Sequence, residues 1–481
     1  MTTAPTPGDV LSQGPRSADL AIVAGVVLAV AAHQTCYWVY GLTPQQCWVA
    51  AVTALCAAWW LTQAVPIAIT SLTPFIVFPL AGVADAGKVA EALGDRTILL
   101  FMGGFMLSKA AEHHGTHVQM ADRVLRLVGT TSNPRIVLAF LITSASLSMW
   151  ISNTATTLIM LPVGLAVLAR SPSQSLAVPL MLSIAYGASI GGLATPIGTP
   201  PNLIFMANYE QITGKGIPFV SWMMIGIPIS LALLGVAFAI LAFTAGRGAA
   251  IVLPPLQRWT KPQILVLIVF ACAAMAWMTR VAPYGGWQQW LGLKFADDYT
   301  VALVAVLALF LIPSTEGGGR RLLNWTVASS IPWGLLLLFA GGIALARGFR
   351  TSELDLVIGR QLAEFASFHP LVLIAIIALV VTFLTEIANN TAVATLLMPL
   401  LGAVAVGVGI EPALMMIPAA ISASCAFMLP VATAPNAIIF SSDRVTIPQM
   451  AARGLLLNLA GTITNTLICY YLLDFVLRRL D

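Results

Sequence analysis

Two short polar runs lie in the middle of long apolar segments of this chain. The first is residues 148–154 (SMWISNT), inside the apolar segment 136–168, and the second is residues 385–391 (TEIANNT), inside 371–400. Adjacent hydroxyl and amide side chains at membrane depth are costly unless they bind a ligand or one another. They also disfavour continuous helix, because they offer the backbone competing local hydrogen bonds. We therefore predict that each run breaks a spanning helix and faces a site.

The residue types in these runs suit a cation and an anion together. Hydroxyl oxygens, Asn carbonyl oxygens and free backbone carbonyls are ligands for a hard monovalent cation such as sodium, and helix C-termini add negative dipole. Helix N-termini, amide NH2 groups and hydroxyl donors suit an anion. Neither run contains Lys or Arg, and Glu386 is the only acid within them. The pattern predicts a small anion whose charge is compensated by bound cations, and hence cation-coupled anion transport.

Two polar features receive a structural interpretation. Glu386 could carry protons, but a buried acid satisfied by hydrogen bonds at the helix break is the interpretation we favour. The run 464–466 (TNT) has the same chemistry as the first polar run but no matching partner elements. We assign it interhelical hydrogen bonding and no site.

The composition is that of an integral membrane protein. Of 481 residues, 59% are hydrophobic and only 9% are charged, whereas soluble domains have about 25% charged residues. So few charges cannot cover a soluble surface. A net charge of +4 is small and gives no reason to expect a nucleic-acid partner.

Three elements recur in the same order in the two halves of the chain. A Gly-Gly pair comes first, and 238 positions separate Gly104 from Gly342. The polar runs follow, displaced by 237 positions, and then GTPPN at 198–202 recurs as ATAPN at 432–436 after 234 positions. Three ordered matches with nearly constant spacing indicate an internal duplication. Duplicated halves with broken helices are typical of secondary transporters, whose site lies at the repeat interface.

Apolar runs of about 20 residues are long enough to span a bilayer. We find about eleven, near 19–40, 46–63, 65–83, 136–168, 175–206, 219–244, 262–282, 299–313, 370–407, 413–440 and 449–476. Two further apolar stretches, 98–111 and 331–346, are short for a span, and each contains a Gly-Gly pair. We predict re-entrant hairpins near 94–122 and 331–350, because irregular backbone at membrane depth is tolerated where it lines a cavity. The alternative for the Gly-Gly pairs is close helix packing.

These features divide the chain into two halves. The predicted units are a polar tail at 1–18, a first repeat at 19–245 with its broken helix at 152–154, a basic, Pro-containing linker at 246–261, and a second repeat at 262–481 with its broken helix at 389–391. The count of spans does not by itself fix the relative orientation of the halves.

The ordered elements resemble the divalent anion/sodium symporter family, which includes the sodium-coupled di- and tricarboxylate carriers. The resemblance rests on SNT in a broken helix, a second copy after Thr-Glu, and the GTPPN and ATAPN elements, and it extends over essentially the whole chain. It implies an all-α membrane protein with two inverted repeats, eleven transmembrane helices and two re-entrant hairpins. It also implies a homodimer that moves its transport part by an elevator mechanism.

The resemblance further implies two sodium sites and one substrate site. The first sodium site would use Ser148, Ser152, Asn153 and the backbone of Gly198. The second would use Thr385, the backbone of Ala388, Asn390 and the backbone of Ala432. The substrate carboxylates would meet Ser152, Asn153, Thr154, Thr199, Pro200, Asn389, Asn390, Thr391, Thr433 and Ala434.

Two positions depart from the family pattern. Asn389 replaces the usual Ser of the second SNT, and Ala434 replaces a proline in the last element. Asn is larger than Ser and brings an NH2 group with two donors, and Ala restores a backbone donor. We expect an altered substrate preference. The sodium positions are unchanged, which favours a sodium symporter over the sodium-independent exchangers.

We expect a secondary active transporter that couples inward sodium movement to uptake of a small dianionic organic acid, a C4-dicarboxylate such as succinate. The alternatives are a sodium-independent dicarboxylate exchanger and a transporter of sulfate or sulfonates. A channel would need a continuous pore, and an enzyme a nucleophile–base pair or metal cluster, which the sequence does not suggest. Sodium ions would be co-transported, with no organic cofactor, and the partners would be a small anion, membrane lipid and a second copy. Short tails and loops favour a prokaryotic inner membrane.

Overall fold

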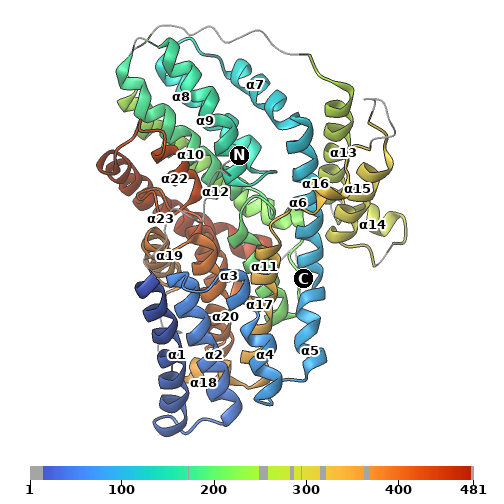
Figure 1. Ribbon diagram of the computed structural model, residues 1–481, viewed down its shortest axis with the longest axis vertical. Helices are drawn as coiled ribbons and strands as arrows, with labels where there is room; N and C mark the ends of the chain where they lie inside the picture. Colours follow the sequence, from blue (N-terminus) through green and yellow to red (C-terminus); the bar gives the residue numbers. More distant parts are fainter. Residues whose placement is uncertain are drawn as a thin grey trace.

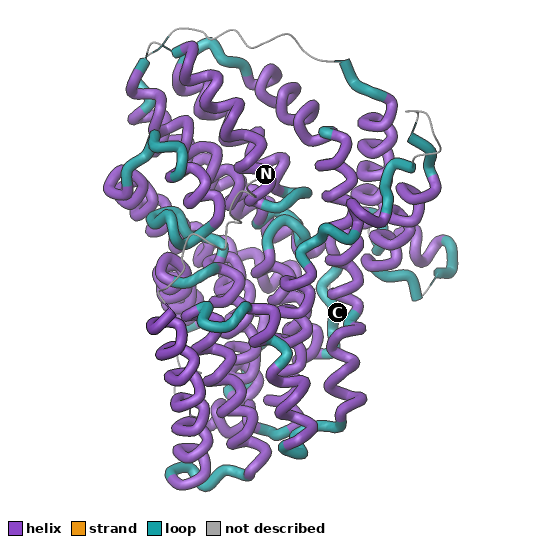
Figure 2. Tube along the Cα trace, viewed as in Figure 1, coloured by secondary structure: helices purple, strands orange, loops and turns teal. Residues whose placement is uncertain are grey.

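The computed structural model describes residues 15–171, 173–246, 248, 258–281, 286–293, 295–314, 321–361 and 369–477. Within these ranges the regular structure is helical, as Figure 2 shows, and the one β-bridge joins Pro313 to Arg321. Residues 1–14 of the predicted tail and 249–257 of the predicted linker lie outside the described residues. The prediction of an all-α protein is confirmed.

Figure 1 labels the helices in the order of the chain. Those of the first half are α1 (Pro15–Trp38), α2 (Pro44–Thr62), α3 (Ile67–Thr70), α4 (Thr73–Leu80), α5 (Ala86–Ala90), α6 (Arg96–His114), α7 (Thr116–Val128), α8 (Asn133–Ser148), α9 (Asn153–Arg170), α10 (Ala177–Gly192), α11 (Pro200–Thr213) and α12 (Phe219–Thr244). Those of the second half are α13 (Lys261–Met278), α14 (Gly286–Trp290), α15 (Asp298–Leu311), α16 (Trp325–Ala328), α17 (Trp333–Thr351), α18 (Leu354–Gln361), α19 (Pro370–Ile387), α20 (Asn390–Gly407), α21 (Pro412–Ala423), α22 (Ala434–Phe440) and α23 (Ile447–Leu477).

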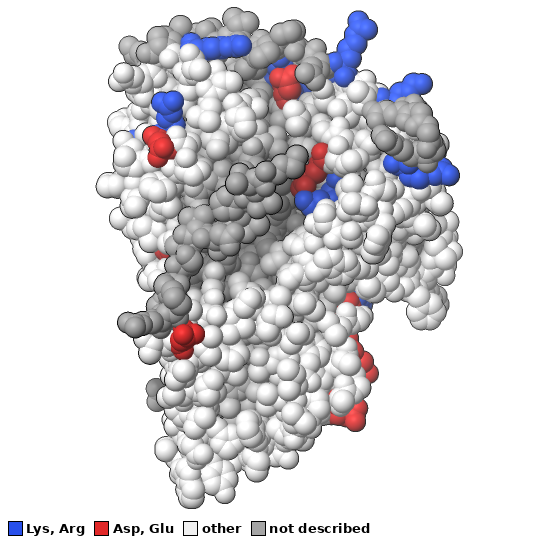
Figure 3. All heavy atoms as spheres, in the orientation of Figure 1, with Lys and Arg blue, Asp and Glu red and all other residues white. Residues whose placement is uncertain are grey.

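Several of these helices have the length and composition of membrane spans. In the described part of the chain, nine are long and apolar enough to cross a bilayer, and three shorter apolar helices accompany them. Figure 3 shows a face on which most visible charged side chains lie in the upper half or along the right edge. Five of the predicted apolar runs are each divided into two α-helices, namely 65–83, 136–168, 175–206, 370–407 and 413–440. Length and composition alone therefore do not give the number of crossings.

The first polar run is the tip of a helical hairpin and not a break in one spanning helix. The amide of Asn133, at the start of α8, donates to the hydroxyl of Ser173, just beyond the end of α9, over 3.1 Å. The two distant ends of the α8–α9 pair therefore lie together, and the chain reverses at residues 149–152. The prediction of a broken helix at 152–154 is wrong in this respect. The reason is that polar residues interrupt a helix without fixing the direction in which the chain leaves.

The second polar run also lies at a chain reversal. The hydroxyl of Thr385, near the end of α19, donates to the carbonyl of Ala423 at the end of α21, so these two helices finish together. Helix α20 packs back along α21, since a Cβ on Gly402 would lie 3.2 Å from the sulfur of Met416. Helix α20 thus runs opposite to α21 and opposite to α19. The predicted break at 389–391 is the tip of a second hairpin.

The hairpins predicted near 94–122 and 331–350 are not formed there. Helices α6 and α17 run unbroken through their Gly-Gly pairs. A Cβ on Gly103 would lie 2.6 Å from the Cβ of Ala302, and one on Gly341 would lie 2.5 Å from the carbonyl oxygen of Ser71. The Gly-Gly pairs therefore allow close packing between helices, which small residues make possible.

The truly interrupted helices carry the third repeated element. Residues 193–199 separate α10 from α11, and residues 424–433 separate α21 from α22. Proline explains why helix restarts there, since Pro200 and Pro435 lie within the first two positions of α11 and α22 and a proline is tolerated at a helix start. Each half thus contributes one hairpin and one interrupted helix.

The helices form two groups according to their packing. We call α8–α12 with α19–α23 the hairpin bundle, and α1–α6 with α13 and α15–α17 the framework. Within the hairpin bundle α9 packs on α22 and α11 packs on α20, which is the same pairing with the halves exchanged. In Figure 1 α9 lies in the upper part of the molecule and α20 in the lower part. The two hairpins therefore approach the middle from opposite ends, as expected for inverted repeats.

Candidate functional site

One cavity of about 420 Å³ is lined by both hairpin tips and both helix interruptions. All ten predicted substrate-binding residues line it, together with two residues of the predicted sodium sites. These are Ser152, Asn153, Thr154, Gly198, Thr199, Pro200, Asn389, Asn390, Thr391, Ala432, Thr433 and Ala434. Ser148, Thr385 and Ala388 are buried outside the cavity lining, behind the tips.

Helix capping fixes the position of Ser152 at the start of α9. Ser152 precedes the helix in extended conformation, and its hydroxyl accepts from the backbone N–H of Ala155 over 3.2 Å. Such a cap satisfies one of the otherwise free amides of the first turn. The remaining free N–H groups and the positive end of the helix dipole face the cavity, which favours a negative ligand.

An oxygen cluster lies directly behind the first tip. The hydroxyl of Ser148 is 2.6 Å from Oδ1 of Asn153. The same Asn153 atom is 3.1 Å from the carbonyl oxygen of Ala188 and 3.2 Å from that of Gly198. Four oxygens therefore converge, and the Ser148 hydroxyl supplies the one proton among them. Of the predicted first sodium site, this cluster brings together Ser148, Asn153 and Gly198 and adds Ala188.

The Asn153 amide can satisfy this cluster in two ways. Its NH2 group can turn towards the three neighbouring oxygens and donate to them. Alternatively its oxygen faces them, as it does in the structure, and a cation between the oxygens balances their partial charges. Hydroxyl, amide and backbone oxygens are the ligands that hard cations prefer. The donor set therefore fits a sodium ion.

A second, smaller oxygen cluster lies behind the other tip, and there the hydroxyl and not the asparagine contacts the backbone carbonyl. The Thr385 hydroxyl is 2.7 Å from Oδ1 of Asn390 and 2.8 Å from the carbonyl oxygen of Ala423. Ala423, like Ala188, belongs to the helix that precedes the interruption. Ala388 ends α19 in extended conformation between Thr385 and Asn390, and Ala432 lines the cavity. The sequence analysis did not identify Ala188 or Ala423, because a backbone carbonyl leaves no signal in residue type.

The two interruption loops are held by one repeated contact. The amide of Asn202 donates to the carbonyls of Gly192 and Thr195, over 3.0 and 2.8 Å. In the second half the amide of Asn436 donates to the backbone carbonyls of Ala426 and Leu429, over 3.1 and 3.0 Å. Both asparagines are completely buried. The last residue of GTPPN and of ATAPN therefore shapes the loop that presents the carbonyls, and does not touch the substrate cavity.

Glu386 makes a structural network behind the second tip. Its carboxylate accepts from the backbone N–H groups of Phe427, Met428 and Leu429, over 2.7, 2.9 and 3.0 Å. It also accepts from the amide of Asn458 on α23 over 2.7 Å. The carboxylate is thus satisfied by four donors and fixes the loop after α21, as the structural interpretation of Glu386 predicts.

The two departures from the family pattern have different surroundings. Asn389 caps α20, with its carbonyl oxygen accepting from the N–H of Thr391 over 2.9 Å. Asn389 therefore performs the capping role of Ser152 and retains its NH2 group as a donor beside the cavity. Ala434 is the first residue of α22 and is exposed. The preceding Thr433 uses its hydroxyl to accept from the N–H of Asn436 over 3.3 Å.

Several cavity residues come from outside the repeated elements. Lys109 and Glu112 of α6 line the cavity as an ion pair, with Nζ and Oε2 2.6 Å apart. Trp150, at the first tip, stacks on Phe219 and contacts Phe270 of α13 edge-on. Lys109 lies in the apolar stretch 98–111, which the sequence analysis assigned to a hairpin and not to the substrate site. The cavity is therefore less purely neutral than the two polar runs suggested.

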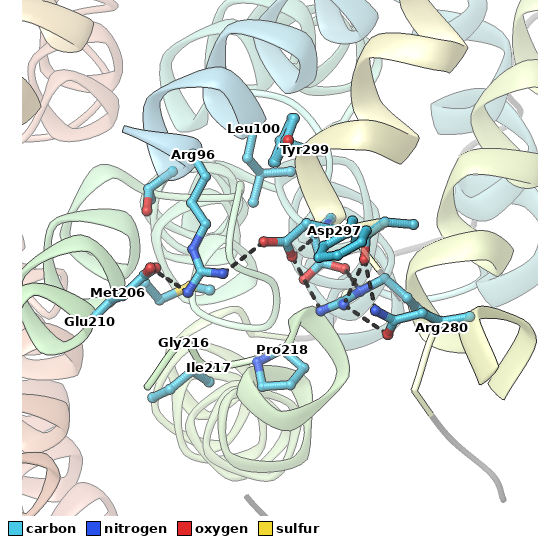
Figure 4. A pocket seen from close by; sticks show the side chains of 15 residues that line it. Arg96, Leu100, Met206, Glu210, Gly216, Ile217, Pro218, Arg280, Asp297 and Tyr299 are labelled. Carbon is cyan, nitrogen blue, oxygen red and sulfur yellow. Dashed lines mark hydrogen bonds and ion pairs between the residues drawn. The ribbon is translucent and has the colours of Figure 1, made fainter. Parts of the chain in front are cut away.

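A network of charged residues joins the framework to the hairpin bundle away from the cavity. Figure 4 shows Arg96, at the start of α6, between Glu210 of α11 and Asp297. The distance from Arg96 to Asp297 is 3.0 Å. On the other side of α11, Nε of Arg347 on α17 donates to Oε1 of Gln211 over 2.9 Å. The end of α11 is thus held between two framework helices by arginines.

Paired hairpin tips and interrupted helices around one cavity, contributed by two inverted halves, define a secondary membrane transporter. Comparisons with known proteins agree with this class. The family model described as citrate transporter matches residues 57–417. The chain belongs to this family of integral membrane transport proteins, and it is not an enzyme.

Individual proteins are similar over most of the chain. A protein of Staphylococcus saprophyticus named sodium-dependent dicarboxylate transporter SdcS is 37% identical over 459 residues, which cover 91% of this chain and 88% of the relative. The protein of the same name from Staphylococcus aureus is 38% identical over 454 residues, covering 89% and 86%. The crystal structure of the Alcanivorax borkumensis YdaH transporter has the same fold, with a TM-score of 0.56 at 13% identity over 82% of this chain and 90% of that one.

Proposed function

We propose that the protein couples inward sodium movement to the uptake of a small dianionic organic acid, a C4-dicarboxylate such as succinate. The observation that carries the proposal is the pair of oxygen clusters behind the two tips, since each shares an asparagine with the lining of one cavity. The relatives that are named sodium-dependent dicarboxylate transporters support the same ion and substrate class.

In the proposed site each cluster binds one sodium ion. The first ion is bound by Ser148, Asn153 and the carbonyl of Gly198, with Ser152 beside it. The second ion is bound by Thr385 and Asn390, with Ala388 and Ala432. A bound cation brings positive charge next to the amides and hydroxyls that meet the substrate carboxylates. The substrate then binds well only when sodium is present, and this coupling is reciprocal because it is a free energy shared by two sites.

The substrate residues of the proposed site are the ten predicted ones that line the cavity. Ser152 and Asn389 donate with the side-chain hydrogens that capping leaves free. Asn153, Asn390, Thr154 and Thr391 add donors from the first turn of each helix. The helix N-termini at both tips favour the same carboxylates.

Alternating access in this proposal is an elevator movement of the hairpin bundle against the framework. Two features support it. The cavity is formed mainly by the hairpin bundle, with α6 and the residues just before α17 closing one side. The contacts between the groups include polar pairs that can separate, such as Arg347 with Gln211. The proposal also includes a homodimer joined through the frameworks, as the family resemblance implies.

Uptake of labelled succinate into liposomes that contain the purified protein tests the proposal. We expect saturable uptake that requires an inward sodium gradient. Uptake that ignores sodium but needs an anion inside the liposome would indicate exchange instead. If the protein does not take up succinate but recognises sulfate or taurine, its substrate belongs to that class and not to the dicarboxylates. The mass of the detergent-solubilised protein by light scattering, expected at two chains, tests the homodimer.

A further inference from the structure

Lys109 introduces a full positive charge into a cavity whose tips are neutral. It is the only basic side chain among the described residues that line the cavity, and Glu112 is the only acidic one. Both belong to α6 of the framework, whereas the asparagines and threonines of the site belong to the hairpin bundle. The cavity therefore has one charged wall, contributed by the framework, in addition to its two uncharged tips.

Lys109 can exchange its partner Glu112 for another carboxylate. Their side chains are 30% and 24% exposed, and Nζ lies 2.6 Å from Oε2. No other hydrogen bond or ion pair of Lys109 occurs within the described ranges. A lysine ammonium has three donors, so at least two remain for another acceptor. Ion pairs between partly exposed side chains contribute little to stability, and a competing carboxylate can therefore replace Glu112.

In the proposed site the carboxylates of a dianion meet two tips, and each tip has one sodium ion behind it. Two bound sodium ions lie behind the tips in the proposed site, on the side of Ser148 and Thr385. Glu112 lines the same cavity, and its charge would be uncompensated there if Lys109 were neutral. A carboxylate in the cavity would then be repelled by a like charge. A lysine in this wall removes that repulsion and provides a direct partner.

We propose that Lys109 is a specificity-determining residue that binds one carboxylate of the dianion, in addition to the donors of the tips, and so selects dianions over monoanions. Glu112 holds the ammonium group when no substrate is bound and gives it up when the dianion enters. This inference rests on the proposed function, because it presumes that the transported solute is a dianion held at the two tips.

The test compares four variants in the liposome assay. Lys109→Gln removes the charge, Lys109→Arg keeps it, and Glu112→Gln removes the competing carboxylate. Lys261→Gln is the matched control, since Lys261 is an exposed lysine at the start of α13 away from the cavity. For each variant we would measure the KM for succinate, the sodium concentration at half-maximal rate, and inhibition by monomethyl succinate, which keeps the carbon skeleton but carries one charge.

We expect Lys109→Gln to raise the succinate KM about tenfold, the usual effect of losing a hydrogen bond to a charged group. Its inhibition by monomethyl succinate should stay unchanged, and so should its sodium requirement. Glu112→Gln should lower the succinate KM, while Lys109→Arg and Lys261→Gln should preserve discrimination between the two acids. In this role the two substitutions change the succinate KM in opposite directions. If the ion pair were only structural, Lys109→Gln and Glu112→Gln would both impair transport.

Equal losses in Lys109→Gln and Glu112→Gln, or unchanged discrimination in Lys109→Gln, would overturn the inference. Failure of the proposed function would be seen separately, in the unmodified protein. If that protein transports sulfate and not succinate, the same variants are compared with sulfate as the dianion and the monoanion taurine as competitor. If Lys109→Gln does not fold, Glu112→Gln still decides, because a raised or unchanged succinate KM there contradicts the inference.

Discussion

The hydroxyl of Thr385 lies 2.7 Å from the amide oxygen of Asn390, and the hydroxyl of Ser148 lies 2.6 Å from that of Asn153. In each half the hydroxyl is on the hairpin arm that enters the site, and the asparagine begins the arm that leaves it. One contact therefore closes each tip and shapes both the proposed cation pocket and the cavity wall. In the proposed site this geometry couples sodium to substrate, because the same asparagine side chain borders both.

Replacement of either asparagine should weaken sodium and substrate binding together. Asn153→Ala and Asn390→Ala each remove one cluster oxygen and one cavity amide. We expect the succinate KM and the sodium concentration at half-maximal rate each to rise about tenfold, equivalent to about 1.4 kcal/mol. Asn465→Ala is the control, because Asn465 donates its amide to Pro418 and Ser422 at a helix contact. A higher succinate KM with an unchanged sodium requirement would contradict the shared-ligand arrangement.

Glu386 should matter for stability more than for coupling. Glu386→Ala leaves three backbone N–H groups and the amide of Asn458 without an acceptor, and each unsatisfied buried donor costs about 1–3 kcal/mol. We expect a large decrease in the Tm of the purified protein, and a smaller one for Glu386→Gln, which retains one acceptor oxygen. The sodium dependence of residual uptake by Glu386→Gln should be unchanged. Uptake driven by a proton gradient in the unmodified protein, and lost in Glu386→Gln, would instead support a proton carrier.

Asn389 should influence the choice of substrate without affecting sodium. Asn389→Ser retains a cap for α20, since serine is as good a capping residue as asparagine. It removes the NH2 group beside the cavity and enlarges the space there. We expect the ranking of succinate, glutarate and citrate as competitors to change, by severalfold in their inhibition constants. The sodium response should be the same as in the unmodified protein, and an unaltered ranking would show that Asn389 only caps the helix.

The sequence predicted the residues that line the cavity better than the path of the chain. Ser152, Asn153 and Asn390 were predicted to share a site because polar triplets repeat at a constant spacing in apolar surroundings, and all three line the cavity. Such a triplet can interrupt a helix or reverse the direction of the chain. Which of the two occurs depends on packing along α10 and α21, and neither composition nor hydropathy contains that information. The glycines of α6 and α17 were misassigned for a similar reason, since close helix packing and a tight turn both select glycine.

The groups that sequence analysis missed are of two kinds. The carbonyls of Ala188 and Ala423 belong to the backbone, so only the fold brings them to the clusters. Lys109 lies on α6, outside the polar runs and the GTPPN and ATAPN elements, and only the tertiary structure places it in the same cavity as the tips. Both kinds depend on contacts between segments far apart in the chain.

The ion pair between Arg96 and Glu210 should stabilise the conformation described here relative to the others of the transport cycle. Arg96 belongs to the framework and Glu210 to the hairpin bundle, so an elevator movement must separate them. Partly exposed ion pairs contribute about 0.2–1 kcal/mol, which predicts a change of up to about fivefold in the population of this conformation. We expect Arg96→Gln and Glu210→Gln each to alter the maximal uptake rate by a few-fold, and the double variant to change it no further. The four-protein cycle of uptake rates measures this coupling. If the effects of the single changes simply add in the double variant, the two side chains do not interact during transport and the charged network of α6 and α11 does not separate in the cycle.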